Sequence, residues 1–171
     1  MRWPVNNQRK TCVLFGAYCL VLLWIVLFNL AFAVADIRAL QAARSVNWIP
    51  ISYGADVGRF HRKETVLNVL VFIPLGLYFG MFGLKPGKAL ALGLGISLGL
   101  ELCQLLFAIG ATDVTDLLTN TFGTALGLFL YALLKILYRD KQKADRFLNT
   151  LATAALILFG AMITLLFLSN K

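Results

Sequence analysis

Apolar residues run almost unbroken through five stretches of the chain, and most of the charged residues lie between them. The stretches cover about 12–35, 66–84, 88–108, 115–138 and 149–168. An α-helix needs about 20 apolar residues to cross the hydrocarbon core of a bilayer. The pattern therefore predicts an all-α membrane protein, a polytopic bundle of five transmembrane helices with one longer loop after the first helix.

The composition agrees with a protein whose exterior faces lipid. Hydrophobic residues make up 60% of the 171 residues, and the mean hydropathy is +0.80. Soluble domains are about 45–50% apolar. Since few residues remain outside the five helices, we expect a single membrane domain over residues 1–171.

The net charge of +8 arises from basic residues at the helix ends and not from one patch, so we expect no nucleic-acid partner. Cytoplasmic segments of membrane proteins are enriched in Lys and Arg. With the N-terminus inside, ten basic residues lie inside and six outside, and five of the six fall in the one longer loop. This bias predicts an N-in, C-out topology. The charged segment 138–146 then becomes a solvated cytoplasmic turn.

The first apolar stretch ends in AFAVAD, residues 31–36, which resembles a signal-peptide cleavage site. Its apolar run is longer than the 7–15 residues typical of a signal peptide, so we expect an uncleaved helix. The three cysteines, Cys12, Cys19 and Cys103, form no CxxC pair and have no histidine nearby. We therefore expect neither a disulfide, nor a metal site, nor a cofactor.

Glycines four residues apart occur in each of the three central apolar stretches. Such pairs let two helix backbones approach closely in a membrane. The pairs are Gly76 and Gly80, Gly95 and Gly99, and Gly123 and Gly127. They predict that the second, third and fourth helices form a tight core, with the first and fifth helices at its periphery.

Polar residues interrupt the same three stretches at helical spacing. Ser97, Glu101 and Gln104 share one face of the third helix. In the predicted topology, Glu101 lies roughly 10 Å below the outer surface, at about 1.5 Å per residue. Acidic residues at that depth usually face protein or water and mark functional sites.

The neighbouring helices carry matching polar stripes. Asp113, Asp116 and Asn120 open the fourth helix, and Asn68 follows His61 and Glu64 on the second. All three stripes fall in the outer leaflet of the predicted topology. We therefore expect an outward-facing polar pocket whose ligand-binding residues are Asn68, Glu101, Gln104, Asp113, Asp116 and Asn120.

Several interpretations of this pocket stay open at the level of sequence. Paired carboxylates can act as acid and base, which makes Glu101 and Asp116 the candidate catalytic residues of a membrane-embedded lipid-modifying enzyme. The stripes can instead be interhelical hydrogen-bond clamps in a structural or accessory protein that scaffolds envelope enzymes. A divalent-cation site has no spacing signature here, and five helices without an inverted repeat argue against a transporter.

Four motifs in order resemble the VanZ-like family of bacterial membrane proteins. They are NWIP from Asn47, NVLVFIPLG from Asn68, the pair Glu101 and Gln104, and DVTDLLTNTFGTALG from Asp113. The resemblance covers about residues 45–135. It implies a four-helix core at about 12–138, an additional C-terminal helix at about 149–168, and a multi-pass protein of the bacterial cytoplasmic membrane.

The resemblance also implies a broad role. The family takes its name from a protein associated with resistance to the glycopeptide teicoplanin. The implied partners are membrane lipids, a lipid-linked cell-wall precursor or a lipidated glycopeptide antibiotic. Similar proteins often carry an arginine in the turn near Gly110, where this chain has AIGAT. Either loop residues Arg59, Arg62 or Lys63 replace that charge, or the site is altered.

Overall fold

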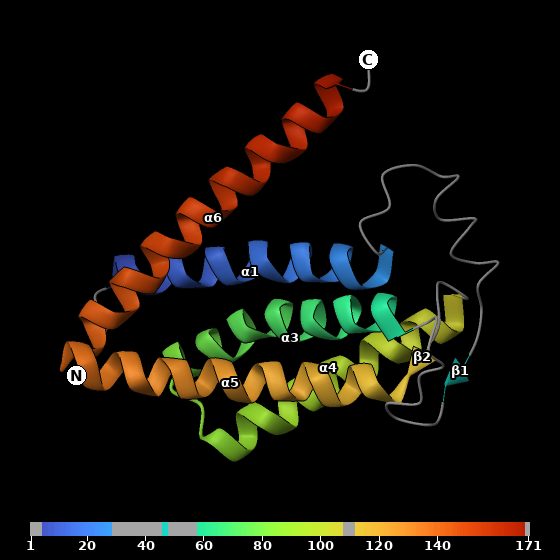
Figure 1. Cartoon of the computed structure of the whole chain (residues 1–171). Helices are drawn as coiled ribbons and strands as arrows, with labels where there is room; N and C mark the ends of the chain where they lie inside the picture. Colours follow the sequence, from blue (N-terminus) through green and yellow to red (C-terminus); the bar gives the residue numbers. More distant parts are fainter. Residues whose placement is uncertain (1–4, 29–45, 48–57, 108–111, 170–171) are drawn as a thin grey trace. The chain divides into compact units, whose positions relative to one another are not determined.

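The computed structural model of the protein describes residues 5–28, 46–47, 58–107 and 112–169, with the backbone alone described at 5–6, 27–28, 46–47, 58–64, 107, 112–113, 167 and 169. Five helices occur in these ranges (Figure 1). They are α1 (Val5–Phe28), α3 (Gly58–Met81), α4 (Pro86–Phe107), α5 (Val114–Tyr138) and α6 (Lys141–Ser169). Each predicted apolar stretch overlaps a helix, which confirms the all-α prediction, and residues 82–84 of the second stretch lie in the turn after α3. Residues 29–35 of the first stretch lie outside the described ranges.

Four of the helices are long and apolar enough to cross a membrane. Their apolar spans are Asn7–Val26, Pro86–Leu106, Val114–Tyr138 and Lys141–Leu166. The apolar part of α3 covers Thr65–Met81, within a helix of 24 residues. At 1.5 Å per residue this helix is about 36 Å long, which exceeds the ~30 Å hydrocarbon core of a bilayer. The fold is that of a helical membrane bundle.

A short parallel pairing connects two segments that are far apart in the sequence. Strand β1 (Val46–Asn47) pairs with β2 (Thr112–Asp113), with Val46 opposite Thr112 and Asn47 opposite Asp113. The segment that follows α1 is thereby joined to the start of α5. No periodicity in the sequence predicts this pairing, because two residues are too few to show an alternation.

The chain divides into two compact units. Unit 1 contains Met1–Ala17 and Leu133–Lys171, and unit 2 contains Tyr18–Ala132. Helices α1 and α5 therefore contribute residues to both.

In unit 2, α3 and α5 pack through their glycines. A Cβ atom on Gly76 would lie 2.9 Å from the Cα of Gly127, and a Cβ on Gly127 would collide with the carbonyl oxygen of Ile73. A Cβ on Gly123 would lie 2.9 Å from the Cβ of Phe72. The two backbones are in direct contact along the helices drawn side by side in Figure 1. The prediction of close packing is confirmed for the glycine pairs of α3 and α5.

The glycine pair of α4 does not take part in this packing. Nothing lies within 4 Å of a Cβ placed on Gly95 or Gly99. A Cβ on Gly93 would instead lie 2.8 Å from the side chain of Thr124 on α5. Successive helix positions are about 100° apart, so Gly95 points about 200° away from Gly93. The prediction for Gly95 and Gly99 is wrong because this pair shares its face with Leu98, whose side chain is 48% exposed.

In unit 1, a buried polar contact joins α1 to α6. Asn149 donates its Nδ2 to Thr11 Oγ1 at 2.9 Å, and both residues are almost fully buried. The Thr11 hydroxyl also lies 3.0 Å from the carbonyl oxygen of Asn7. These bonds satisfy polar groups inside an otherwise apolar interface, so they fix the register of the two helices.

The charged segment 138–146 is mostly helix, which makes the prediction of a solvated turn wrong. Only Arg139 and Asp140 form the turn; Arg139 has a φ of 49°, and Asp140 Oδ1 accepts a hydrogen bond from the backbone N–H of Gln142 at 2.8 Å. Asp145 is completely buried and pairs with Lys141 Nζ at 2.6 Å. The physical reason is amphipathic spacing, because Asp145 shares the buried face of α6 with Asn149.

Candidate functional site

The polar face of α4 is directed into the protein. Ser97 has no exposed surface, and Glu101, one turn further along, is 6% exposed. Leu98 and Leu102, on other faces of the same helix, are about half exposed. Burying a carboxyl group within a membrane span is costly, so its position against protein and not against lipid is the arrangement that physical chemistry favours.

Two contacts define how α4 and α5 face each other. Asn120, which is 2% exposed, donates its Nδ2 to Ser97 Oγ at 2.9 Å. Gly93 lies against Thr124. Gly93 precedes Ser97 by four residues on α4, and Thr124 follows Asn120 by four residues on α5. The register is therefore antiparallel, with 93 opposite 124 and 97 opposite 120. One further turn along each helix brings Glu101 and Asp116 to corresponding levels.

Gln104 extends the polar face to a third helix. Its Nε2 donates to the carbonyl oxygen of Val26 on α1 at 2.8 Å. The α1 segment is held to α3 as well, because Tyr18 donates its hydroxyl to the carbonyl oxygen of Val71 at 2.9 Å. Within unit 2, α1 is therefore a hydrogen-bonded wall of the bundle, which the sequence analysis placed at the periphery.

Two buried amide oxygens on this face accept no hydrogen bond from the residues that the structure describes. They are Asn120 Oδ1 and Gln104 Oε1. A buried acceptor left unsatisfied costs about 1–3 kcal/mol. In sequence register, Asn120 lies level with Ser97 and Gln104 lies beyond Glu101, so the two oxygens flank the level of the buried carboxyl group. We call the face formed by Ser97, Glu101, Gln104 and Asn120 the α4–α5 polar face.

The remaining predicted site residues are Asp116, Asn68 and Asp113. Asp116 is half-buried in the first turn of α5, and its carbonyl oxygen accepts a hydrogen bond from Thr119 Oγ1 at 3.2 Å. Asn68 is half-buried on α3. Asp113 lies in β2 opposite Asn47, with its backbone alone described. The structure therefore links two of the three predicted stripes through the hydrogen bond between Asn120 and Ser97.

Some elements of the sequence prediction lie in ranges with no described side chains. These are the cations Arg59, Arg62 and Lys63, which lie in the first two turns of α3 and not in the predicted loop, the residues His61 and Glu64, and the turn near Gly110. What replaces the family arginine in AIGAT stays a prediction. Among the residues that are described, no group of three or more His, Cys, Asp or Glu side chains could hold a metal ion.

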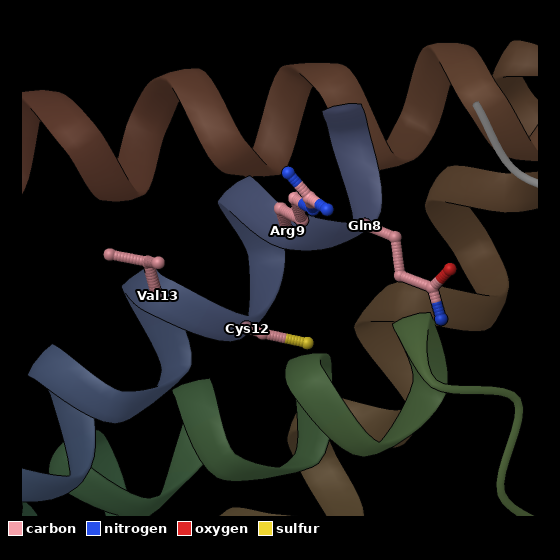
Figure 2. Close-up of a pocket in the computed structure, with 4 residues that line it drawn as sticks. All are labelled: Gln8, Arg9, Cys12 and Val13. Carbon is pink, nitrogen blue, oxygen red and sulfur yellow. The ribbon is translucent and has the colours of Figure 1, made fainter. Parts of the chain in front are cut away.

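A separate groove lies on α1 in unit 1, and sequence reasoning missed it. It has a volume of about 510 Å³ and is lined by Gln8, Arg9, Cys12 and Val13 (Figure 2). None of the predicted site residues lines it. The sequence gives no signal for this groove, because an arginine one turn before a valine is a common pattern at the end of a membrane helix. The predicted pocket on the α4–α5 polar face stays a prediction.

We expect Ser97→Ala to destabilise the protein by about 1 kcal/mol, since it removes the acceptor of the buried Asn120 amide; interhelical hydrogen bonds in membranes average about 0.6 kcal/mol and reach about 1.7. Thermal unfolding in detergent measures this effect. Thr164→Ala is the matched control, because the Thr164 hydroxyl is exposed and bonds only to the carbonyl of Gly160 in its own helix. Equal losses for both variants would show that the contact between α4 and α5 contributes nothing.

Comparison with known proteins places this fold in a family. The family model described as VanZ/LLP1 matches residues 15–135. A curated relative, "Protein VanZ" of Enterococcus faecium, is 38% identical over 149 residues, which cover 85% of this chain and 87% of the relative. No solved structure matches the chain. The family match includes the whole α4–α5 polar face and ends before α6 begins.

Proposed function

We propose that this chain, which belongs to the VanZ/LLP1 family, binds the head group of a cell-envelope amphiphile at the α4–α5 polar face. The amphiphile is an envelope lipid, a lipid-linked cell-wall precursor or a lipidated glycopeptide antibiotic, and the role resembles that in teicoplanin resistance. The observation that carries the proposal is the burial of Glu101 at a level flanked by two amide oxygens that accept no hydrogen bond from any described residue.

The chemistry of the face selects a class of head group. Asn120 Oδ1 and Gln104 Oε1 are acceptors, and the Glu101 carboxyl group accepts hydrogen bonds when ionised. A ligand that satisfies the two amide oxygens must donate hydrogen bonds, as protonated amines, amide N–H groups and sugar hydroxyls do. A phosphate group offers mainly acceptors and carries the wrong charge. Peptide and sugar parts of a cell-wall precursor or a glycopeptide fit this requirement.

The proposed orientation makes the face accessible from outside. With the N-terminus inside, α4 runs outward and Glu101 lies six residues before its end at Phe107. That offset corresponds to about 9 Å along the helix axis. A head group at the outer interface would reach it, and lipid-linked precursors and lipidated glycopeptides are met at that surface. The excess of basic residues in the segments placed inside supports the orientation.

Expression of the chain in a glycopeptide-susceptible bacterium tests the proposal. We expect the inhibitory concentration of teicoplanin to rise several-fold relative to cells carrying an empty vector. A glycopeptide without an acyl chain is the control ligand, because the proposal requires an amphiphile in the membrane. Unchanged susceptibility to teicoplanin, with the protein present in the membrane, contradicts the resistance role.

The interhelical hydrogen bonds favour a second candidate, a structural or accessory protein that scaffolds envelope enzymes. Asn120 to Ser97 and Gln104 to Val26 are contacts that a clamp would make. If the protein is such a scaffold, substitutions of Asn120 lower its thermal stability in proportion to their effect on the teicoplanin susceptibility of the cells. For a binding site, loss of function exceeds loss of stability.

If the protein is a lipid-modifying enzyme, its site would use the carboxyl groups of both Glu101 and Asp116. The register of α4 and α5 brings Glu101 and Asp116 to corresponding levels, with Glu101 more deeply buried. Glu101 would then serve as a protonated acid and Asp116 as an ionised base. Turnover of purified envelope lipids that depends on both residues would distinguish this version from binding alone.

A further inference from the structure

The described part of unit 1 carries a strong excess of positive charge. It contains seven basic and two acidic residues, a difference of five. Both acidic residues are engaged, because Asp145 pairs with Lys141 and Asp140 caps the first turn of α6. Arg9 and Lys10 on α1 and Arg146 on α6 are exposed, and no ion pair links them to another described residue.

The groove on α1 begins at this charge and continues into the membrane span. Gln8 and Arg9 lie at the start of the span Asn7–Val26, and Cys12 and Val13 lie one turn further along it. One turn is about 5.4 Å. All four side chains are exposed, Val13 to 72%. Figure 2 shows the polar side chains of Gln8 and Arg9 on one turn of α1 and the side chains of Cys12 and Val13 on the following turn.

A fixed helix contact supports the groove from behind. Thr11, on the buried side of α1, accepts a hydrogen bond from Asn149 on α6 at 2.9 Å. Arg9 precedes Thr11 by two residues and Arg146 precedes Asn149 by three, so both cations lie on the segments next to this contact. The positive charge is thus held beside the polar end of the groove.

We propose that this α1 groove binds one anionic phospholipid, with its phosphate at Gln8 and Arg9 and the start of an acyl chain along Cys12 and Val13. A guanidinium group offers five N–H donors that match phosphate oxygens. The order of groups along the helix, cation first and apolar side chains one turn deeper, matches the order in a phospholipid. The occupant is anionic because both acidic residues in the described part of unit 1 are already engaged and do not neutralise the local charge excess.

This inference does not rest on the proposed function. The α1 groove presents donors, the amide of Gln8 and the guanidinium of Arg9, whereas the α4–α5 polar face presents acceptors. The two surfaces therefore select opposite chemistries. One can fail experimentally without affecting the other.

Native mass spectrometry of the full chain released from nanodiscs tests the proposal. The nanodiscs contain equal amounts of phosphatidylglycerol and phosphatidylcholine. We expect the wild type to retain phosphatidylglycerol preferentially. A basic residue near an anionic surface contributes about 1 kcal/mol, so Arg9→Gln should reduce this preference about fivefold. Lys85→Gln removes one exposed cation from the turn between α3 and α4 and should leave the preference unchanged.

A second variant separates the groove from charge alone. Val13→Trp fills the apolar end and keeps every cation, and we expect it to displace the retained phosphatidylglycerol. Equal effects of Arg9→Gln and Lys85→Gln, or unaltered retention in Val13→Trp, would overturn the proposal. Circular dichroism establishes that each variant is helical, and residue 13 faces outward, so the substitution does not enter the protein core.

Discussion

Replacing Gly127 with leucine is expected to destabilise the protein by more than about 3 kcal/mol, beyond the usual 1–3 kcal/mol for overpacking. The reason is the identity of the atoms that a side chain would meet. They belong to the backbone of α3, namely the carbonyl group of Ile73 and the Cα of Gly76, which cannot rotate away as a side chain does. The helices must separate instead. Thermal unfolding in detergent and the yield of monodisperse protein measure this loss.

Gly95→Leu is the matched control. It places the same side chain in a glycine pair of the same spacing, at a position where nothing lies within 4 Å of the new Cβ. Replacing glycine within a helix gains up to about 1 kcal/mol of helix propensity. We therefore expect unchanged or slightly higher stability. Similar losses for Gly95→Leu and Gly127→Leu would contradict the packing of α3 against α5.

The difference between these glycines shows what the sequence can predict. All three glycine pairs have the same spacing, and spacing alone does not say which way a helix is rotated. The polar stripe of α4 contains that information, because Ser97 and Glu101 must face protein and Gly93 shares their face. Gly95 and Gly99 lie on another face and meet nothing. Combining the two patterns would have identified Gly93.

The helices themselves are predictable because lipid leaves few alternatives. Every backbone polar group in the hydrocarbon region must be satisfied within the protein, so a long apolar stretch has to be helical. The same physics made the stripe of Ser97, Glu101 and Gln104 visible. The partner of Gln104 was not visible, because it is the backbone carbonyl of Val26, which leaves no mark in a side-chain pattern.

The burial of Asp145 was missed for a different reason. A run rich in charge between two apolar stretches usually forms a solvated turn. The prediction for residues 138–146 relied on this charged composition and not on the spacing of the residues. Lys141, Asp145 and Asn149 are spaced by four, which is the spacing of one helix face. An acidic residue between a basic partner and an amide on that face is compatible with burial, since both its charge and its neighbours are satisfied internally.

Substituting Glu101 with glutamine is expected to abolish protection against teicoplanin while the protein stays folded. Glutamine has nearly the same volume but carries no charge, and it brings a donor group to a face where the amide oxygens of Asn120 and Gln104 accept no hydrogen bond from a described residue. A hydrogen bond to a charged group contributes about 1.5–3 kcal/mol, so head-group binding should weaken about 10- to 100-fold. Stability should be preserved or raised, because the buried group is neutral.

Two further variants sharpen this expectation. Asp140→Asn makes the same chemical change in the turn before α6, where Asp140 contributes only a helix cap, and should leave protection intact. Asn120→Leu removes the unsatisfied amide oxygen Oδ1 and also the hydrogen bond that the amide nitrogen Nδ2 donates to Ser97. Since these two effects on stability oppose each other, we expect a small net change in unfolding temperature and a large loss of protection.

The decisive measurement is the teicoplanin susceptibility of cells that carry the wild type, Glu101→Gln or Asp140→Asn at equal amounts in the membrane. Our account predicts protection by the wild type and Asp140→Asn and susceptibility with Glu101→Gln, whose unfolding temperature is not lowered. Full protection by a folded Glu101→Gln protein would contradict the claim that the α4–α5 polar face is the functional site.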